Sequence, residues 1–224
     1  MVIFAGMGRY ANLHTHRLTD SNVLEIVNQY PEAFEDGIPH YSIGIHPWRI
    51  EGADIDAQLD LMEARLSDPN CVAIGECGLD KRIDTPLERQ IEVFESQWLL
   101  AEKYRKPVII HCVAAYQEVI GIKKRLGISV PSIIHGFSKS GQVADSLLQH
   151  GFYISFGKYL LRNPELATVF ASIPDDRFFL ETDTVDEAIE KVYEVAAKAK
   201  GIGIAGLQEI VRGNFARVFP ELFP

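Results

Sequence analysis

Hydrophobic and polar positions along the chain fall into blocks that predict strands followed by helices. Seven short segments are near-continuous apolar runs, which is typical of parallel strands buried on both faces of a sheet. We expect these strands at residues 10–16, 40–47, 71–80, 107–113, 131–137, 152–157 and 178–183. Between them, apolar residues recur at helical spacing, most clearly in residues 85–105.

This alternation of strands and helices predicts a parallel sheet, and seven or eight such units would close it into a barrel. We therefore expect a single α/β domain over residues 1–224, built as a TIM-like (β/α) barrel. Residues 17–39 are too few for both a full strand and a full helix. Segment 22–30 is either a strand without its helix or a helix without its strand. We expect the barrel to be distorted or truncated in its first units.

The composition narrows the class of protein. The chain is 47% hydrophobic but has no apolar run long enough to span a membrane and no recognisable signal peptide, so we expect a cytoplasmic protein without a membrane partner. Its three cysteines lack C-x-x-C spacing, which argues against disulfides and a zinc ribbon. A net charge of -9 disfavours general electrostatic binding along nucleic acid, although a local phosphate site remains compatible with it. The oligomeric state stays open, with a monomer as the expectation.

Histidines and acids gather at the ends of the predicted strands. In barrels of this type the active site lies at the C-terminal ends of the strands. A single histidine there usually has a structural role, but polar side chains are costly at the ends of so many apolar strands unless they serve a joint purpose. The residues in question are His14, His16, His46, Glu76, His111, His135 and Asp183.

Their spacing predicts a metal site. Residues two apart on a strand point to the same face, so His14 and His16 can bind one ion together. Imidazoles combined with carboxylates suit Zn, Mn, Fe, Co or Ni better than Mg, and the identity of the metal stays open. We predict two divalent ions, one held by His14, His16, Glu76 and Asp183 and the other by Glu76, His111 and His135.

Such a pair of ions, about 3.5–4 Å apart, can activate water for hydrolysis. Asp183 is expected to accept the proton of that water, and Glu76 to act as the bridging ligand. Positive charges beside the same strand ends predict a phosphate-bearing substrate. We expect His46 to contact the substrate or shape the pocket and Trp48 to stack on a base or simply pack, alongside four cations: Lys81, Arg82, Lys139 and Lys158.

A series of motifs over nearly the whole chain resembles the TatD-like metal-dependent hydrolases, or TatD deoxyribonucleases, of the amidohydrolase superfamily. In order, they are HTH, GIHP, IGECGLD, Q-x-x-x-F-x-x-Q-x-x-L-A at 90–101, PVIIH, HGFS, LETD and N-x-x-R-V-F at 214–219. The resemblance implies a distorted (β/α)8 barrel and two divalent ions on the same six ligands. It also implies hydrolysis of phosphodiester bonds in DNA, exonucleolytic cleavage included.

The chain departs from this family's pattern at four places. Asn12 stands where an acid usually precedes H-x-H, which weakens the carboxylate support of the two histidines. Val113 replaces an arginine and Trp48 a histidine. The loop after Asp183 is short, so we expect a more open pocket on that side.

Three functions are compatible with these residues. The first is a metal-dependent phosphodiesterase that acts on DNA or a smaller phosphodiester. The second is amidohydrolase-type cleavage of a small amide, imide or lactone, because a fold does not determine its chemistry. The third is a catalytically weak metal-binding protein, which Asn12, Val113 and the short loop after Asp183 would explain. Nucleotide release from DNA, amide and lactone panels, and metal analysis distinguish them.

Overall fold

Eight parallel strands form one sheet in the computed structural model, which describes residues 10–19 and 22–223. Each strand pairs with the next along the chain, as the sequence predicts for a barrel of this class. The strands are β1 (Tyr10–Thr15), β2 (Val23–Gln29), β3 (Tyr41–Ile43), β4 (Cys71–Asp80), β5 (Val108–Val113), β6 (Ser132–Ile134), β7 (Phe152–Phe156) and β8 (Phe178–Leu180).

The first and last strands close the barrel at the end that carries the H-x-H motif. Thr15 forms a parallel bridge with Asp183 just beyond β8. The backbone N–H of Asp183 donates to the carbonyl of His14 at 2.9 Å, and that of His16 donates to the carbonyl of Asp183 at 3.3 Å. The closure therefore places Asp183 directly beside the two histidines, and it confirms the predicted TIM-like α/β barrel.

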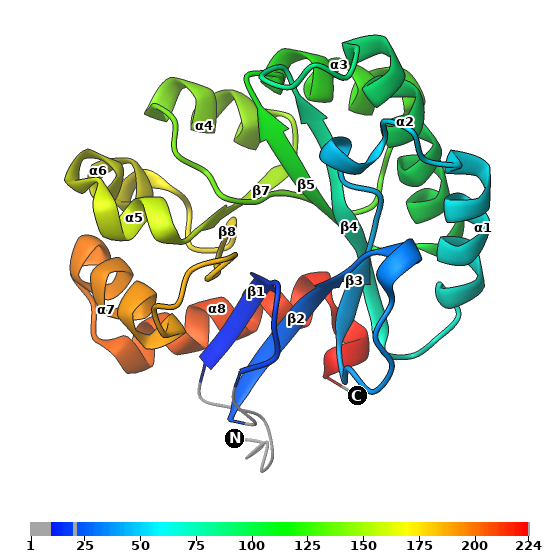
Figure 1. Cartoon of the computed structure of the whole chain (residues 1–224). Coiled ribbons are helices and arrows are strands. Elements are labelled where there is room, and N and C mark those ends of the chain that lie inside the picture. The colour runs from blue at the N-terminus through cyan, green and yellow to red at the C-terminus, as the bar shows by residue number, and fades with distance from the viewer. Residues whose placement is uncertain (1–9, 20–21, 224) are drawn as a thin grey trace.

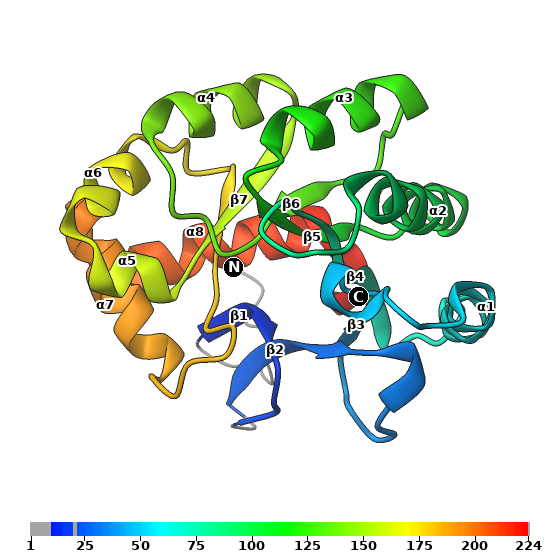
Figure 2. The same cartoon turned by 45° about the horizontal axis from the view of Figure 1, so that its top comes forward.

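Helices surround the barrel on most of its outer face (Figures 1 and 2). Their apolar faces cover the strands, which explains why the strand segments are apolar throughout. The helices are α1 (Ile55–Arg65), α2 (Leu87–Tyr104), α3 (Tyr116–Leu126), α4 (Gly141–Gln149), α5 (Lys158–Arg162), α6 (Pro164–Ser172), α7 (Ile189–Lys200) and α8 (Ile204–Val218). None of the helices in the described ranges is both long and apolar enough to cross a lipid bilayer.

The early part of the barrel is truncated, as expected. Segment 22–30 forms strand β2, so the alternative of a helix at this place is wrong. Between β2 and β3 the described chain contains only a short 3-10 turn, Pro31–Ala33. The outer side of β2 accordingly has no helix against it in either view (Figures 1 and 2).

Three of the strands are shorter than predicted by three residues or more. β3, β6 and β8 have three residues each, so His46, His135 and Asp183 lie in the loops that follow them. The backbone turns at these points: Gly136 has a φ of 59° and Asp183 a φ of 57°. A left-handed conformation cannot continue a strand, so the apolar pattern alone overestimated the lengths of β6 and β8.

Two buried glutamines on α2 fix the loops at the C-terminal ends of β3 and β4. Gln97 accepts a hydrogen bond from Ile45 N at 2.7 Å and donates to Ile45 O at 3.2 Å. Gln90 accepts from Asp80 N at 2.8 Å and donates to Asp80 O at 3.0 Å. These bonds satisfy buried backbone groups at the ends of the two strands. Helix α2 therefore positions Asp80 and Ile45, the residue before His46.

Candidate metal centre

The carboxylate of Glu76 lies at the centre of the strand ends, and its two oxygens face different sets of histidines. On one side, Glu76 Oε2 is 3.5 Å from Nε2 of both His14 and His16. Asp183 Oδ1 completes this side at 3.4 Å from His16 Nε2 and 3.9 Å from His14 Nε2. Both ring nitrogens of His14 are buried and have no hydrogen-bond partner among the described residues. A buried imidazole needs a partner, and a metal ion would supply one.

On the other side, Glu76 Oε1 is 2.7 Å from His135 Nε2 and 2.9 Å from His111 Nδ1. The second nitrogen of each ring faces a carboxylate: His111 Nε2 is 3.4 Å from Asp80 Oδ2, and His135 Nδ1 is 3.4 Å from Glu181 Oε1. A neutral imidazole has one donor and one acceptor nitrogen. When each outer nitrogen donates to its carboxylate, the inner lone pair points toward Glu76, an arrangement typical of metal-binding histidines.

His46 joins the same cluster. Its Nε2 is 3.2 Å from Glu76 Oε1, and the donor atoms of His46, Glu76 and His111 lie within 4.8 Å of one another. However, Nδ1 of His46 accepts a hydrogen bond from Trp48 N at 3.1 Å. Burial lowers the pKa of His46, so the ring is neutral near pH 7 and its proton must be on Nε2. The geometry therefore suits His46 as a donor to Glu76 better than as a metal ligand.

The electrostatics of the cluster keep both inner carboxylates ionised. Burial alone would raise the pKa of Glu76, but His135, His111 and His14 hold it well below its usual range. Burial likewise opposes a low pKa for Asp183, yet the hydrogen bond with His16 and the charges nearby lower it. For His16, burial works against protonation, while Asp183 and Glu76 raise its pKa to about 9. Two anionic carboxylates are thus available to a cation at neutral pH.

Two carboxylates at the site escaped the sequence analysis. Asp80 accepts hydrogen bonds from Trp48 Nε1 and Arg82 N, both at 2.9 Å, in addition to its contact with His111. Glu181 accepts from Gly136 N at 2.8 Å beside His135. The signal that could have found them is position: both follow apolar strand segments at the same barrel end, Asp80 four residues after Glu76 and Glu181 two before Asp183.

Asn12 serves a purpose other than support of the H-x-H histidines. Its Oδ1 accepts from Thr182 N at 3.0 Å, and its Nδ2 donates to Thr182 Oγ1 at 2.9 Å. The same amide lies 3.4 Å from Glu25 Oε1, an acid buried on β2. Asn12 therefore ties β1 to the residue before Asp183. The short loop after Asp183 is held in turn by Arg17, which donates to Val185 O at 3.1 Å.

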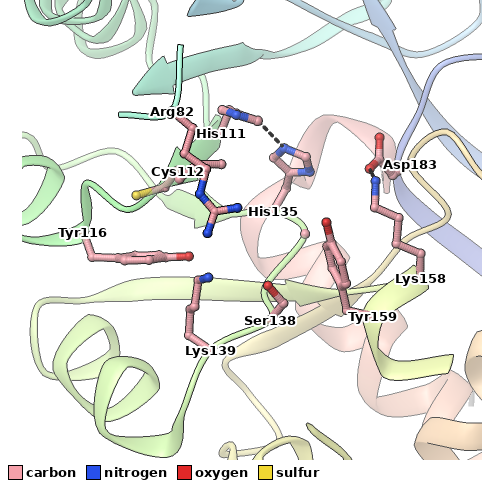
Figure 3. A pocket seen from close by; sticks show the side chains of 12 residues that line it. Arg82, His111, Cys112, Tyr116, His135, Ser138, Lys139, Lys158, Tyr159 and Asp183 are labelled. Carbon is pink, nitrogen blue, oxygen red and sulfur yellow. Dashed lines mark hydrogen bonds and ion pairs between the residues drawn. The ribbon is translucent and has the colours of Figure 1, made fainter. Parts of the chain in front are cut away.

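A cavity of about 110 Å³ opens beside this cluster (Figure 3). His111, His135 and Asp183 form part of its wall, together with three of the predicted cations, Arg82, Lys139 and Lys158. The ammonium of Lys158 donates to Asp183 Oδ2 at 2.6 Å.

The other predicted substrate contacts lie elsewhere. Lys81 pairs with Glu118 and does not line this cavity. Trp48 also lies outside the cavity wall, with 64% of its surface exposed and its ring centroid 6.0 Å from that of His111. The indole is held in place by its hydrogen bond to Asp80.

Gly78 makes the close approach of β4 to β5 possible. Its φ is 145°, and a Cβ at this position would be 2.0 Å from the carbonyl oxygen of His111. We expect Gly78→Ala to lower the free energy of unfolding by about 3 kcal/mol or more, because strain and a backbone clash add together. Thermal or urea denaturation measures this loss. Gly121→Ala on α3 is the control: open space surrounds Gly121, and alanine there should stabilise by about 0.5–1 kcal/mol. Equal stability of the two variants would contradict the prediction.

Comparison with known proteins agrees with this fold and with the motif series. The chain is 32% identical over 154 residues to a metal-dependent hydrolase of Haemophilus influenzae that is described as uncharacterized; the match covers 65% of this chain and 59% of the relative, so the chain spans about three fifths of that protein. It is 29% identical over 185 residues to the 3'-5' ssDNA/RNA exonuclease TatD of Edwardsiella piscicida, with coverage of 80% and 68%.

Among solved structures, the fold matches YjjV, a TatD homologue of Escherichia coli, with a TM-score of 0.84 and 25% identity over 95% of this chain and 98% of that one. A model of the TatD related DNase family matches residues 5–220. The chain therefore belongs to the TatD related DNase family, as its ordered motifs predict.

Proposed function

We propose that this chain is a TatD-type deoxyribonuclease that hydrolyses phosphodiester bonds in DNA with two divalent ions. The observation that carries the proposal is the position of Glu76, whose two carboxylate oxygens each face a separate group of imidazoles. A carboxylate so placed can bridge two ions. The relative in Edwardsiella piscicida, named as an exonuclease on single-stranded DNA and RNA, supports the choice of a nucleic-acid substrate.

The donor set fits two ions of borderline softness, such as Zn, Mn, Ni, Co or Fe, better than Mg. When bound, such ions supply a hydroxide at neutral pH and neutralise charge that develops on a phosphate. His14, His16, Glu76 and Asp183 would hold one ion; Glu76, His111 and His135 would hold the other.

Asp183 is placed to take part in proton transfer. Its Oδ1 faces the histidines of the first set, while Oδ2 faces the cavity wall and accepts from Lys158. Asp183 would accept the proton of the attacking water, and Lys158 would keep the carboxylate in this orientation. Glu76, buried and ionised, fixes the distance between the two ligand sets.

The charge of the cavity supports a phosphate-bearing substrate. Three cations line it, and among the described residues Asp183 is the only carboxylate in its wall and is already paired with Lys158. A neutral amide or lactone would gain little from this wall, whereas a phosphodiester would be attracted to it. This favours the phosphodiesterase over the amidohydrolase alternative.

A substrate survey tests the proposal. The protein would be stripped with a chelator, reloaded separately with Zn, Mn, Co, Ni or Mg, and incubated with end-labelled single-stranded and duplex DNA. We expect metal-dependent release of nucleotides that is absent from the stripped protein. Turnover of an amide, imide or lactone panel without DNA cleavage would support the amidohydrolase alternative instead. Metal binding without turnover of any substrate would support the third alternative, a catalytically weak metal-binding protein.

Metal removal should also lower stability. A ligand that binds only the folded state at a free concentration of 100 times its Kd adds about 2.7 kcal/mol. For a chain of this size each kcal/mol shifts Tm by roughly 2–4 °C, so chelation should lower Tm by roughly 5–11 °C. Differential scanning calorimetry before and after metal is restored measures the shift. An unchanged Tm with every metal would contradict a folded-state metal site.

The setting of the activity is part of the same proposal. We propose that residues 1–224 act as one domain, as a monomer in the cytoplasm. One continuous eight-stranded sheet supports the single domain. The three cysteines are buried and free, which suits a reducing compartment.

A further inference from the structure

Arg82 and Lys139 are two cations at the cavity for which the described residues offer no carboxylate partner. Their neighbours differ in this respect: Lys158 is paired with Asp183, and Lys81 is paired with Glu118. In a protein of net charge -9, most cations near a functional site can find an acid. Two unpaired cations that line one cavity repel each other unless an anion lies between them.

The side chains of Arg82 and Lys139 converge at one side of the cavity, and the hydroxyl of Tyr116 points to the same place (Figure 3). We call these three residues the anion corner. Asp183 and Lys158 lie at the opposite side, with His135 between (Figure 3). The anion corner is thus separate from the ligand set of His14, His16 and Asp183.

The size and chemistry of the anion corner suit a phosphate. A cavity of about 110 Å³ is far below the roughly 300–1,000 Å³ of pockets that enclose a drug-sized ligand, so a nucleoside would not enter it. A guanidinium can donate two parallel hydrogen bonds to a phosphate, and an ammonium adds a point charge. Burial raises the pKa of Tyr116, so its hydroxyl stays protonated and can donate as well.

We propose that the anion corner binds a second phosphate of the substrate, distinct from the phosphate that is cleaved at the metal centre. This inference rests on the proposed function and names its preferred substrate class: short oligonucleotides that carry a terminal phosphate next to the scissile phosphodiester. The terminal group occupies the corner, while the nucleosides remain outside the small cavity. Substrates without the terminal phosphate leave Arg82 and Lys139 without a counter-charge.

The first experiment measures anion binding without any metal or turnover. The full chain, stripped of metal, would be titrated with inorganic phosphate at constant ionic strength, and binding followed by calorimetry. We expect Arg82→Gln and Lys139→Gln each to weaken phosphate binding by about tenfold or more, since each removes a charged hydrogen-bond partner. Lys124→Gln, which removes an exposed charge on α3 away from the cavity, is the matched control and should bind as the wild type does. Equal affinity in all four proteins, or no binding in any, would overturn the anion corner.

The second experiment tests substrate choice. Dinucleotides with a phosphate at the 5' end, at the 3' end or at neither end would be compared in the metal-loaded enzyme. We expect one phosphorylated form to have a kcat/KM at least about tenfold above the unphosphorylated form, mainly through KM, and Arg82→Gln to remove this preference. Equal kcat/KM for all three substrates would overturn the inference. If no dinucleotide or DNA is cleaved, the proposed function fails, while the phosphate titration still decides whether the anion corner exists.

Discussion

Glu76→Ala is expected to abolish metal-dependent turnover and to remove both metal ions together. Each oxygen of Glu76 lies within 3.5 Å of a different set of histidines: Oε2 of two, and Oε1 of three including His46. We therefore expect no other side chain to replace it as a link between the two sets. Losing an outer partner of a metal ligand typically costs 10–100-fold in metal affinity or activity, and loss of the shared ligand should cost more than that. Metal content by mass spectrometry, together with the DNA assay, measures both effects.

A second variant separates the loss of the Glu76 carboxylate from the loss of negative charge elsewhere in the cluster. Glu181→Gln removes a carboxylate whose polar partners, in the part of the chain that the structure describes, are the outer nitrogen of His135 and the backbone N–H of Gly136. We expect this variant to lose roughly 10–100-fold in metal affinity and to keep some turnover. Circular dichroism would verify that both variants fold. Two bound metals and full activity in Glu76→Ala would contradict the bridging role.

The fold was largely predictable because strands buried on both faces leave an unambiguous apolar signal. Segment 22–30 was the exception, because its apolar residues fit either a strand or a helix. Its pairing with β1 and β3 in the structure shows that it is a strand. The ends of β6 and β8 were predicted too late, since an apolar pattern carries no sign of the left-handed conformations of Gly136 and Asp183.

The ligand cluster was predictable for a different reason. Polar residues that end apolar strands must meet at one end of a parallel barrel, so His111 and Glu76 could be placed together without any coordinates. The outer carboxylates were not recognised, because the position of Asp80 against His111 depends on how far β4 is staggered against β5. The orientation of cations was not predictable either. Lys81 and Arg82 are adjacent in sequence, yet one pairs with Glu118 and the other lines the cavity.

Asp183→Asn is expected to preserve the fold and much of the metal while lowering kcat by about 10²–10⁴-fold, the usual contribution of a general base. The backbone of Asp183 has a φ of 57°, a conformation that asparagine tolerates at least as well as aspartate. The side-chain oxygen of asparagine can still face His14 and His16, but the amide cannot accept a proton from water. The N–H₂ group of asparagine would also point at the ammonium of Lys158. Lys158 would then lose the carboxylate oxygen to which it now donates at 2.6 Å.

Asp186→Asn provides the matched control, because it makes the same chemical change three residues further along. Asp186 is exposed and pairs with Arg17 across the short loop, outside the cavity wall. We expect its kcat, metal content and Tm to equal those of the wild type. Single-turnover measurements with saturating metal would show whether Asp183→Asn slows the chemical step itself. If the single-turnover rate constant is unchanged, Asp183 is only a ligand. The proton of the attacking water must then be accepted by another group.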